Sequence, residues 1–201
     1  MWDKVASKET VEELIKALKE RGMEAFYADT GKEGVEKVLS LIPNGSRVLA
    51  GTSRTSDTIG LSEKIDNSKD FTSVRKEYMA LDHNKDKEKI RKSRATPDVV
   101  VGSIHAVTKD GRVLIASNTG SQLASYVYGA SKVIWVIGTQ KIVNNFDDAL
   151  KRIYDYVLPL ESERLKAQYG VPSNVSKLLI IDKEIEPDRI KIVFINEVLG
   201  F

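Results

Sequence analysis

Two short runs of apolar residues set the strongest limit on how this chain can fold. Residues 98–101 read Asp-Val-Val-Val and residues 133–137 read Val-Ile-Trp-Val-Ile, and the glycines Gly102 and Gly138 follow them. Strands that are apolar along their whole length suit a parallel sheet with helices on both faces, because both sides of each strand are then buried. A further strand is expected over residues 112–116, entered through an Asp-Gly turn. The centre of the chain therefore predicts an α/β protein.

Helix and strand patterns alternate along the rest of the chain. Apolar residues recur at helical spacing in three segments, residues 8–21, 32–41 and 146–157. Short apolar runs indicate further strands over residues 24–28, 47–50, 178–181 and 190–195. This alternation predicts an open, mostly parallel sheet flanked by helices. The 201 residues are expected to form a single domain, with the helix at about residues 8–21 packed on its core.

Other segments carry local expectations. Residues 71–78 are a strand candidate, and the highly charged residues 85–94 are expected to form an exposed helix or loop. Pro159 is expected to end the helix that begins at residue 146, with a separate short helix after it. The last two strands lie close together in sequence, so a hairpin-like, antiparallel part of the sheet is expected there.

Composition excludes several classes of function. The 31 basic and 29 acidic residues are interspersed and give a net charge of +2, which does not favour nucleic acid or a membrane surface as partner. The chain has no cysteine, so it has no Fe–S cluster, zinc–thiolate site or cysteine nucleophile of its own. With two histidines, a histidine-rich metal site is also excluded. No apolar run approaches the roughly 20 residues of a membrane span and no signal-peptide pattern opens the sequence, so a cytoplasmic protein is expected.

Two loops of small polar residues follow predicted strands. The first consists of Gly51, Thr52, Ser53, Arg54 and Thr55. Its hydroxyl and backbone N–H groups could hold a phosphate or carboxylate, and the arginine adds a planar donor fork. Equally, its hydroxyls could cap the next helix while the arginine makes a surface ion pair. It is neither a P-loop nor a dinucleotide fingerprint.

The second loop contains Asn118, Thr119, Gly120, Ser121 and Gln122, which offer neutral donors and acceptors. A helix is expected over residues 122–128, with Ser121 as its N-cap. The alternative is a turn built from the usual turn residues. Because two such loops at strand ends of one sheet could converge on one cleft, each makes the other's role in binding more plausible.

Three further residues follow the two most apolar strands. His105 could act as a general acid or base, or donate a hydrogen bond to substrate. Thr139 and Lys141 lie just after Gly138, where the lysine could meet an anion. A loop histidine and a solvated lysine are the plainer interpretations, and the residues alone do not identify a reaction.

Several stretches together resemble the LUD-domain family, and most of all its lactate utilization protein C branch. They are residues 97–108, the Gly-Ser-Gln-Leu at 120–123, residues 133–143, 156–161 and 195–201, together with the loop at 51–55. The resemblance implies a fold similar to the NagB/RpiA/CoA-transferase group, whose members bind sugar phosphates, acyl-CoA, or folate with nucleotide in a cleft at the strand ends. Asn118 stands where a CoA-transferase-type glutamate would be sought, which argues against a covalent acyl-CoA mechanism of that kind.

The family is associated with oxidation of L-lactate to pyruvate, alongside partner proteins that carry Fe–S clusters. The resemblance therefore implies a subunit or accessory factor in lactate utilization that binds a small anionic metabolite. The alternative is a free-standing isomerase, hydrolase or ligase acting on a phosphorylated or nucleotide-linked metabolite, so whether the chain is an enzyme stays open. The fold group is compatible with homodimers, although no apolar stripe in the sequence indicates one.

Overall fold

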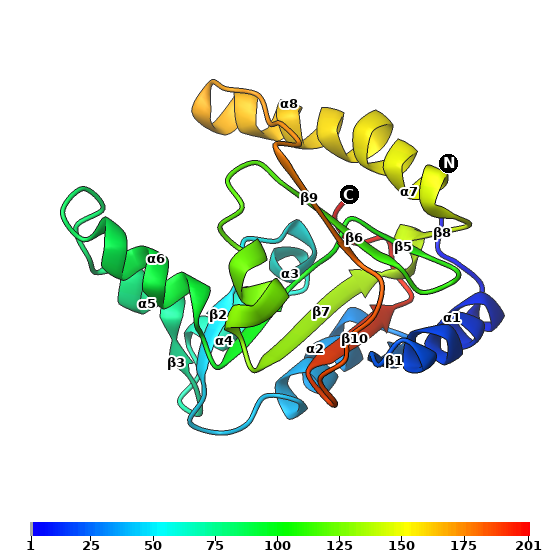
Figure 1. Cartoon of the computed structure of the whole chain (residues 1–201), viewed down its shortest axis with the longest axis horizontal. Helices are drawn as coiled ribbons and strands as arrows, with labels where there is room; N and C mark the ends of the chain where they lie inside the picture. The colour runs from blue at the N-terminus through cyan, green and yellow to red at the C-terminus, as the bar shows by residue number, and fades with distance from the viewer. Residues whose placement is uncertain (1) are drawn as a thin grey trace.

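A six-stranded parallel sheet forms the centre of the protein, whose computed structural model describes residues 2–201 (Figure 1). Its strand order is β1-β10-β7-β4-β2-β3, and every neighbouring pair is parallel. The strands are β1 (Glu24–Ala28), β10 (Ile190–Ile195), β7 (Lys132–Gly138), β4 (Val99–Gly102), β2 (Arg47–Ala50) and β3 (Thr72–Ser73). The predicted α/β fold, with an open, mostly parallel sheet flanked by helices, is confirmed.

Alternate residues of the central strands pack into two separate hydrophobic cores. Val100, Val133 and Trp135 point to the face covered by α1 (Lys8–Glu20), whereas Val101 and Ile134 point to the face covered by α2 (Gly31–Ser40) and α4 (Leu61–Asp66). Because consecutive strand residues point to opposite faces, a strand covered on both sides must be apolar at every position. This explains why β4 and β7 appear in the sequence as unbroken apolar runs.

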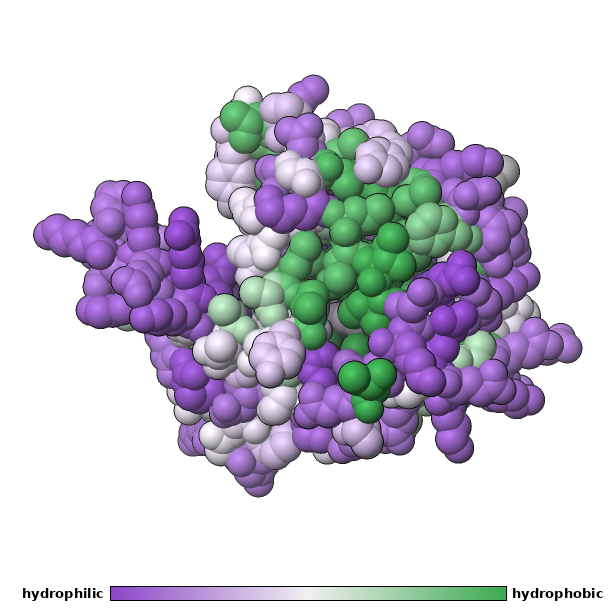
Figure 2. Space-filling model, in the orientation of Figure 1, coloured by the Kyte–Doolittle hydropathy of each residue, from purple (hydrophilic) through white to green (hydrophobic). Residues whose placement is uncertain are grey.

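A second, smaller sheet packs against the first. Its order is β8-β5-β6-β9, formed by β8 (Ile142–Val143), β5 (Ala106–Thr108), β6 (Val113–Ser117) and β9 (Lys177–Ile181). The β5–β6 and β6–β9 pairs are antiparallel, whereas β5–β8 is parallel. The expected hairpin between the last two strands is therefore wrong: β10 enters the parallel sheet between β1 and β7, and β9 forms an edge of the second sheet. Figure 2 shows apolar side chains gathered around β9, where Ile180 is 42% exposed.

The helical segment after β8 also differs from expectation. It runs without a break through α7 (Phe146–Lys151), the π-helical turn η3 (Arg152–Val157) and α8 (Leu158–Tyr169). Pro159 lies at the start of α8 and does not end the helix. A proline removes one backbone N–H, and the π-helical turn just before it accommodates the changed hydrogen bonding.

Two other segments depart from the predicted elements. Residues 71–78 hold only the two-residue β3 before turning into α5 (Val74–Met79), which pairs with α6 (Lys87–Ala95). This pair projects from the body as a largely hydrophilic arm (Figures 1 and 2). The helix expected over residues 122–128 contains the π-helical turn η1 (Ser125–Gly129). Arg189 donates to the carbonyls of Ser125, Tyr126 and Ala130 at 3.3, 2.9 and 3.0 Å, and so supplies partners to carbonyl groups at the C-terminal end of this helix, where internal donors run out.

The carboxyl ends of the parallel strands meet at one edge of the sheet. The segments that leave β2, β4 and β7 there all begin next to a glycine, namely Gly51, Gly102 and Gly138. The short helix α3 (Arg54–Thr58) follows the first of them. None of the helices formed by residues 2–201 is long and apolar enough to cross a membrane.

Candidate functional site

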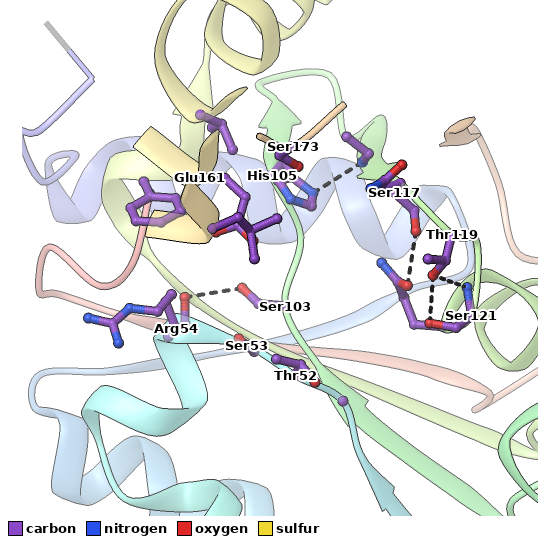
Figure 3. Close-up of a pocket in the computed structure, with 18 of the residues that line it drawn as sticks. Thr52, Ser53, Arg54, Ser103, His105, Ser117, Thr119, Ser121, Glu161 and Ser173 are labelled. Carbon is purple, nitrogen blue, oxygen red and sulfur yellow. Dashed lines mark hydrogen bonds between the residues drawn. The ribbon is translucent and has the colours of Figure 1, made fainter. Parts of the chain in front are cut away.

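A cleft of about 500 Å³ opens at this edge of the sheet. Its floor is formed by the segments after β2 and β4, one wall by the loop after β6, and its roof by α8 and residues 173–175. Figure 3 shows Thr52, Ser53 and Ser103 below, with His105 and Glu161 above them. Ligands of open α/β sheets bind outside the carboxyl ends of the strands, which is where this cleft lies.

His105 is held in its neutral form. Its Nδ1 accepts the backbone N–H of Ala116 at 3.1 Å, so the ring proton belongs on Nε2. Burial among protein atoms, with Lys141 and Arg152 nearby, lowers the pKa of His105 to about 3. The imidazole can therefore donate one hydrogen bond into the cleft at neutral pH, but it is a poor general base there.

Lys141 is buried at the floor of the cleft. Its Nζ lies 3.1 Å from Thr55 Oγ1, 3.2 Å from Ser103 Oγ and 3.1 Å from the carbonyl oxygen of Ile104. These partners are all uncharged, and among the described residues no carboxylate pairs with the amine. Burial, and then the neighbouring charge of Arg152, lower the pKa of Lys141 well below its usual range.

Arg152 is a second buried basic side chain without a carboxylate partner among residues 2–201. It extends from η3 and donates from Nη1 to the carbonyl oxygen of His105 at 2.7 Å. Its guanidinium carbon lies 5.4 Å from the centre of the Tyr156 ring. Its Nε and Nη2 have no hydrogen-bond partner within the described chain. Burial lowers its pKa to about 10. Arg152 thus supports the backbone at His105 and adds positive potential behind the cleft.

Tyr126 supports the floor from below. Its ring packs edge-on against Trp135, with centroids 5.6 Å apart, and its hydroxyl group meets the backbone of Ser103. A Cβ atom added to Gly102 would overlap that hydroxyl oxygen. Gly102 is therefore required by the close approach of the tyrosine, and this packing sets the position of Ser103.

The loop after β6 forms a hydrogen-bonded wall. The Ser117 hydroxyl accepts the backbone N–H of Gly120 at 2.8 Å and bonds to Gln122, and Thr119 bonds to Ser121 at 3.1 Å (Figure 3). Asn118 is turned partly outward, where its side-chain oxygen accepts from Ser176. The predicted N-cap role of Ser121 is wrong, because its hydroxyl bonds to Thr119 and to Arg94.

Arg94 reaches this wall from α6. Its Nη2 lies 3.0 Å from Ser121 Oγ, and its guanidinium carbon lies 5.1 Å from the centre of the Tyr78 ring. Its Nε is buried without a partner among the described residues. A half-buried guanidinium that faces a cleft with neutral partners alone is suited to a carboxylate or phosphate.

Two charged side chains at the rim of the cleft, Arg54 and Glu161, lie in different surroundings. Arg54 is exposed, and its guanidinium points away from Ser103 and His105 (Figure 3). Glu161, on the roof, is neutralised by Arg164 through two hydrogen bonds of 2.7 Å. One of the two acidic residues that line the cleft is therefore already paired.

The last residues of the chain close one end of the cleft. The carbonyl oxygen of Leu199 accepts from Thr55 Oγ1 at 3.1 Å and from Gln140 Nε2 at 2.9 Å, and Phe201 lines the cavity. Glu197 faces away from the cleft and accepts the N–H of Gly31 at the start of α2, at 2.7 Å.

Most of the residues selected from the sequence meet at this cleft. Those that line it are Gly51, Thr52, Ser53, Arg54, Thr55, His105, Asn118, Thr119, Ser121, Gln122 and Lys141. Gly120 and Thr139 do not line it; Thr139 is fully buried, and its hydroxyl accepts the N–H of Ala6. Sequence reasoning did not select Arg94, Ser103 or Arg152. Ser103 could have been found, because it directly follows a strand-ending glycine, as do Thr52 and Thr139.

The family model of the LUD domain matches residues 11–195. The chain belongs to the LUD-domain family. Among solved structures, it resembles a DUF162 family protein from Deinococcus radiodurans, with a TM-score of 0.55 and 11% sequence identity over 95% of this chain and 99% of that one. At this identity the likeness shows the fold alone. For eIF2B beta from Chaetomium thermophilum the TM-score is 0.38, with 18% identity over 70% of this chain and 48% of that one, too low to support an argument. Comparison with curated proteins gives no match.

Proposed function

We propose that this LUD-domain protein is a cytoplasmic subunit or accessory factor of lactate utilization, and that its cleft binds a small anionic metabolite. The family's association with L-lactate oxidation supports the first part. Because the chain has no cysteine, the electrons released in that oxidation would pass to Fe–S clusters on partner proteins.

The observation that carries the second part is Arg94, whose guanidinium faces the cleft without a carboxylate partner in the described chain. The lining as a whole supports it. Four basic residues line the cleft but only two acidic ones, and one of these acids, Glu161, is paired with Arg164. An anion with a planar carboxylate or a phosphate group would supply the missing acceptor for Arg94, next to the hydroxyl groups of the wall.

Thermal shift and calorimetry on the purified protein test ligand binding, with L-lactate, pyruvate, phosphate, sugar phosphates and CoA as probes. A ligand at a hundredfold excess over its Kd stabilises by about 2.7 kcal/mol, which raises the midpoint by roughly 5–10 °C for a chain of this size. Arg94→Met should weaken binding by about 10- to 100-fold, since a hydrogen bond to a charged group contributes about 1.5–3 kcal/mol.

Arg91→Met is the matched control, because Arg91 lies on the same helix and is exposed. It should leave affinity unchanged. Absence of binding by every anion, or equal losses in both variants, contradicts the anion site. The metabolic role is tested separately: deleting the gene in its own host should impair growth on L-lactate, and restoring it should rescue growth.

A further inference from the structure

The hydroxyl group of Ser103 lies against the amine of Lys141, at 3.2 Å, inside the cleft. We propose that Ser103 is a nucleophile with Lys141 as its general base, and that the cleft hydrolyses an ester or thioester of a small carboxylic acid. This activity goes beyond anion binding by a subunit, and it does not depend on Arg94.

The hydrogen bonds around Lys141 fit a neutral amine. The Ile104 carbonyl can only accept, and Thr55 uses its own proton on the carbonyl oxygen of Leu199 at 3.1 Å. Both must therefore accept from Lys141 Nζ, which uses the two protons of a neutral amine. The remaining partner is Ser103 Oγ, 3.2 Å from Nζ and also 3.3 Å from Thr55 Oγ1, to which it donates in this structure (Figure 3). Rotation of the hydroxyl turns its proton from Thr55 toward the nitrogen lone pair.

The surroundings of the amine favour this protonation state. Lys141 is 3% exposed, and within the described chain no carboxylate offsets its charge. Arg152 is already a buried cation nearby, so a second positive charge is disfavoured. Burial thus shifts Lys141 toward the neutral amine, the form that can take a proton from a serine nucleophile.

Ser103 is placed to meet a substrate. It is half-buried, follows the last residue of β4 directly, and is held by the packing of Tyr126 beneath it. His105 lies in the same cleft as a neutral imidazole whose Nε2–H is free of the Ala116 contact (Figure 3). That N–H can donate to the carbonyl oxygen of the substrate, where negative charge develops during attack.

The reaction balances without a redox partner. Ser103 Oγ forms a bond to the acyl carbon while its proton moves to Lys141 Nζ. The bond from that carbon to the leaving oxygen or sulfur breaks, and the leaving atom takes the proton from the lysine. A water oxygen then bonds to the acyl carbon while its proton moves to Lys141 Nζ. The bond from that carbon to Ser103 Oγ breaks, Oγ takes the proton back from the lysine, and the carboxylic acid leaves with Ser103 and the neutral amine restored. Nothing is oxidised or reduced.

An alternative role for Lys141 is purely structural, as a charged group that ties together the loops after β2 and β4. The two roles differ in reactivity. A fluorophosphonate probe labels an activated serine covalently, and a merely structural lysine gives Ser103 no enhanced reactivity toward it. Intact-mass spectrometry of the full chain after incubation with the probe, followed by peptide mapping, therefore separates them.

Wild type should gain one adduct, mapped to Ser103, at a rate that rises with pH and levels off once Lys141 is deprotonated. Ser103→Ala should gain none, and Lys141→Met should react about 100-fold or more slowly, the usual contribution of a general base. Ser62→Ala is the matched control, because that buried hydroxyl lies outside the cleft and has no described partner. It should label as wild type does.

Lack of an adduct on folded wild type, an adduct on another residue, or an equal rate in a folded Lys141→Met variant would overturn the proposal. If Lys141→Met does not fold, the adduct site and pH profile of wild type decide. Anion binding through Arg94 could still hold in that case, because its test measures affinity and not labelling.

Discussion

Gly102→Ala should destabilise the protein through one identifiable overlap. The added Cβ would collide with the Tyr126 hydroxyl oxygen and lie 3.1 Å from Cζ. Tyr126 is 2% exposed and packs edge-on against the fully buried Trp135, so its ring has no free space to enter. Overpacking of this kind costs about 1–3 kcal/mol. For a chain near 200 residues, this corresponds to a fall in Tm of roughly 3–10 °C.

A double-mutant cycle with Tyr126→Phe, measured by urea unfolding, isolates that overlap. In the wild-type background, Tyr126→Phe should cost about 1 kcal/mol, because the backbone of Ser103 loses its partner. In the Gly102→Ala background, Tyr126→Phe should lower the free energy of unfolding by less than this, or even raise it, because it removes the oxygen that collides with the new Cβ. The expected coupling energy is at least about 1 kcal/mol. Additive effects of the two substitutions would refute the overlap as the cause.

Two further predictions concern charge. The pKa of His105, lowered to about 3 from an ordinary 6.5, means that the unfolded state binds its proton first as pH falls. The contribution of His105 to the free energy of unfolding is therefore complete above about pH 6.5 and declines toward pH 3. Wild type should lose up to about 2 kcal/mol of stability through this histidine between pH 7 and 5, and His105→Gln should not show that loss. Urea unfolding at each pH measures both. Glu197→Ala should cost about 1–2 kcal/mol, because the Gly31 N–H loses its acceptor at the start of α2, whereas Glu197→Gln should retain part of it; thermal unfolding distinguishes the two.

The layered core was predictable because burial leaves a direct mark on sequence. Residues 99–101 and 133–137 are apolar at consecutive positions, and both lie in central strands with side chains in two cores. The sequence of a strand does not show which other strands it will pair with. Strands 178–181 and 190–195 are close in sequence and similar in composition, yet they pair with β6 and with β1 and β7 respectively. Their assignment depends on contacts with distant segments, which local pattern does not contain.

The floor of the cleft was predictable for a topological reason. Parallel strands bring their carboxyl ends to one edge, so small polar residues after two or three such strands must meet there. Arg94 and Arg152 could not be found in this way. Each lies in a helix among other charged residues, and an arginine that reaches a cleft or is buried has the same sequence appearance as a solvated one. Only the tertiary packing of α6 and η3 distinguishes them.

The uncompensated charges of the cleft connect anion binding with the chemistry proposed for Ser103. An anion near Lys141 would favour the charged form of the amine, because an opposite charge raises the pKa of a lysine. A protonated lysine cannot accept the proton of Ser103. A carboxylate released by hydrolysis would therefore oppose the next attack for as long as it stayed near Lys141, whereas one held by Arg94 at the wall would leave the amine neutral. Where the anion binds, at the wall or at the floor, thus decides whether binding and catalysis in this cleft are compatible.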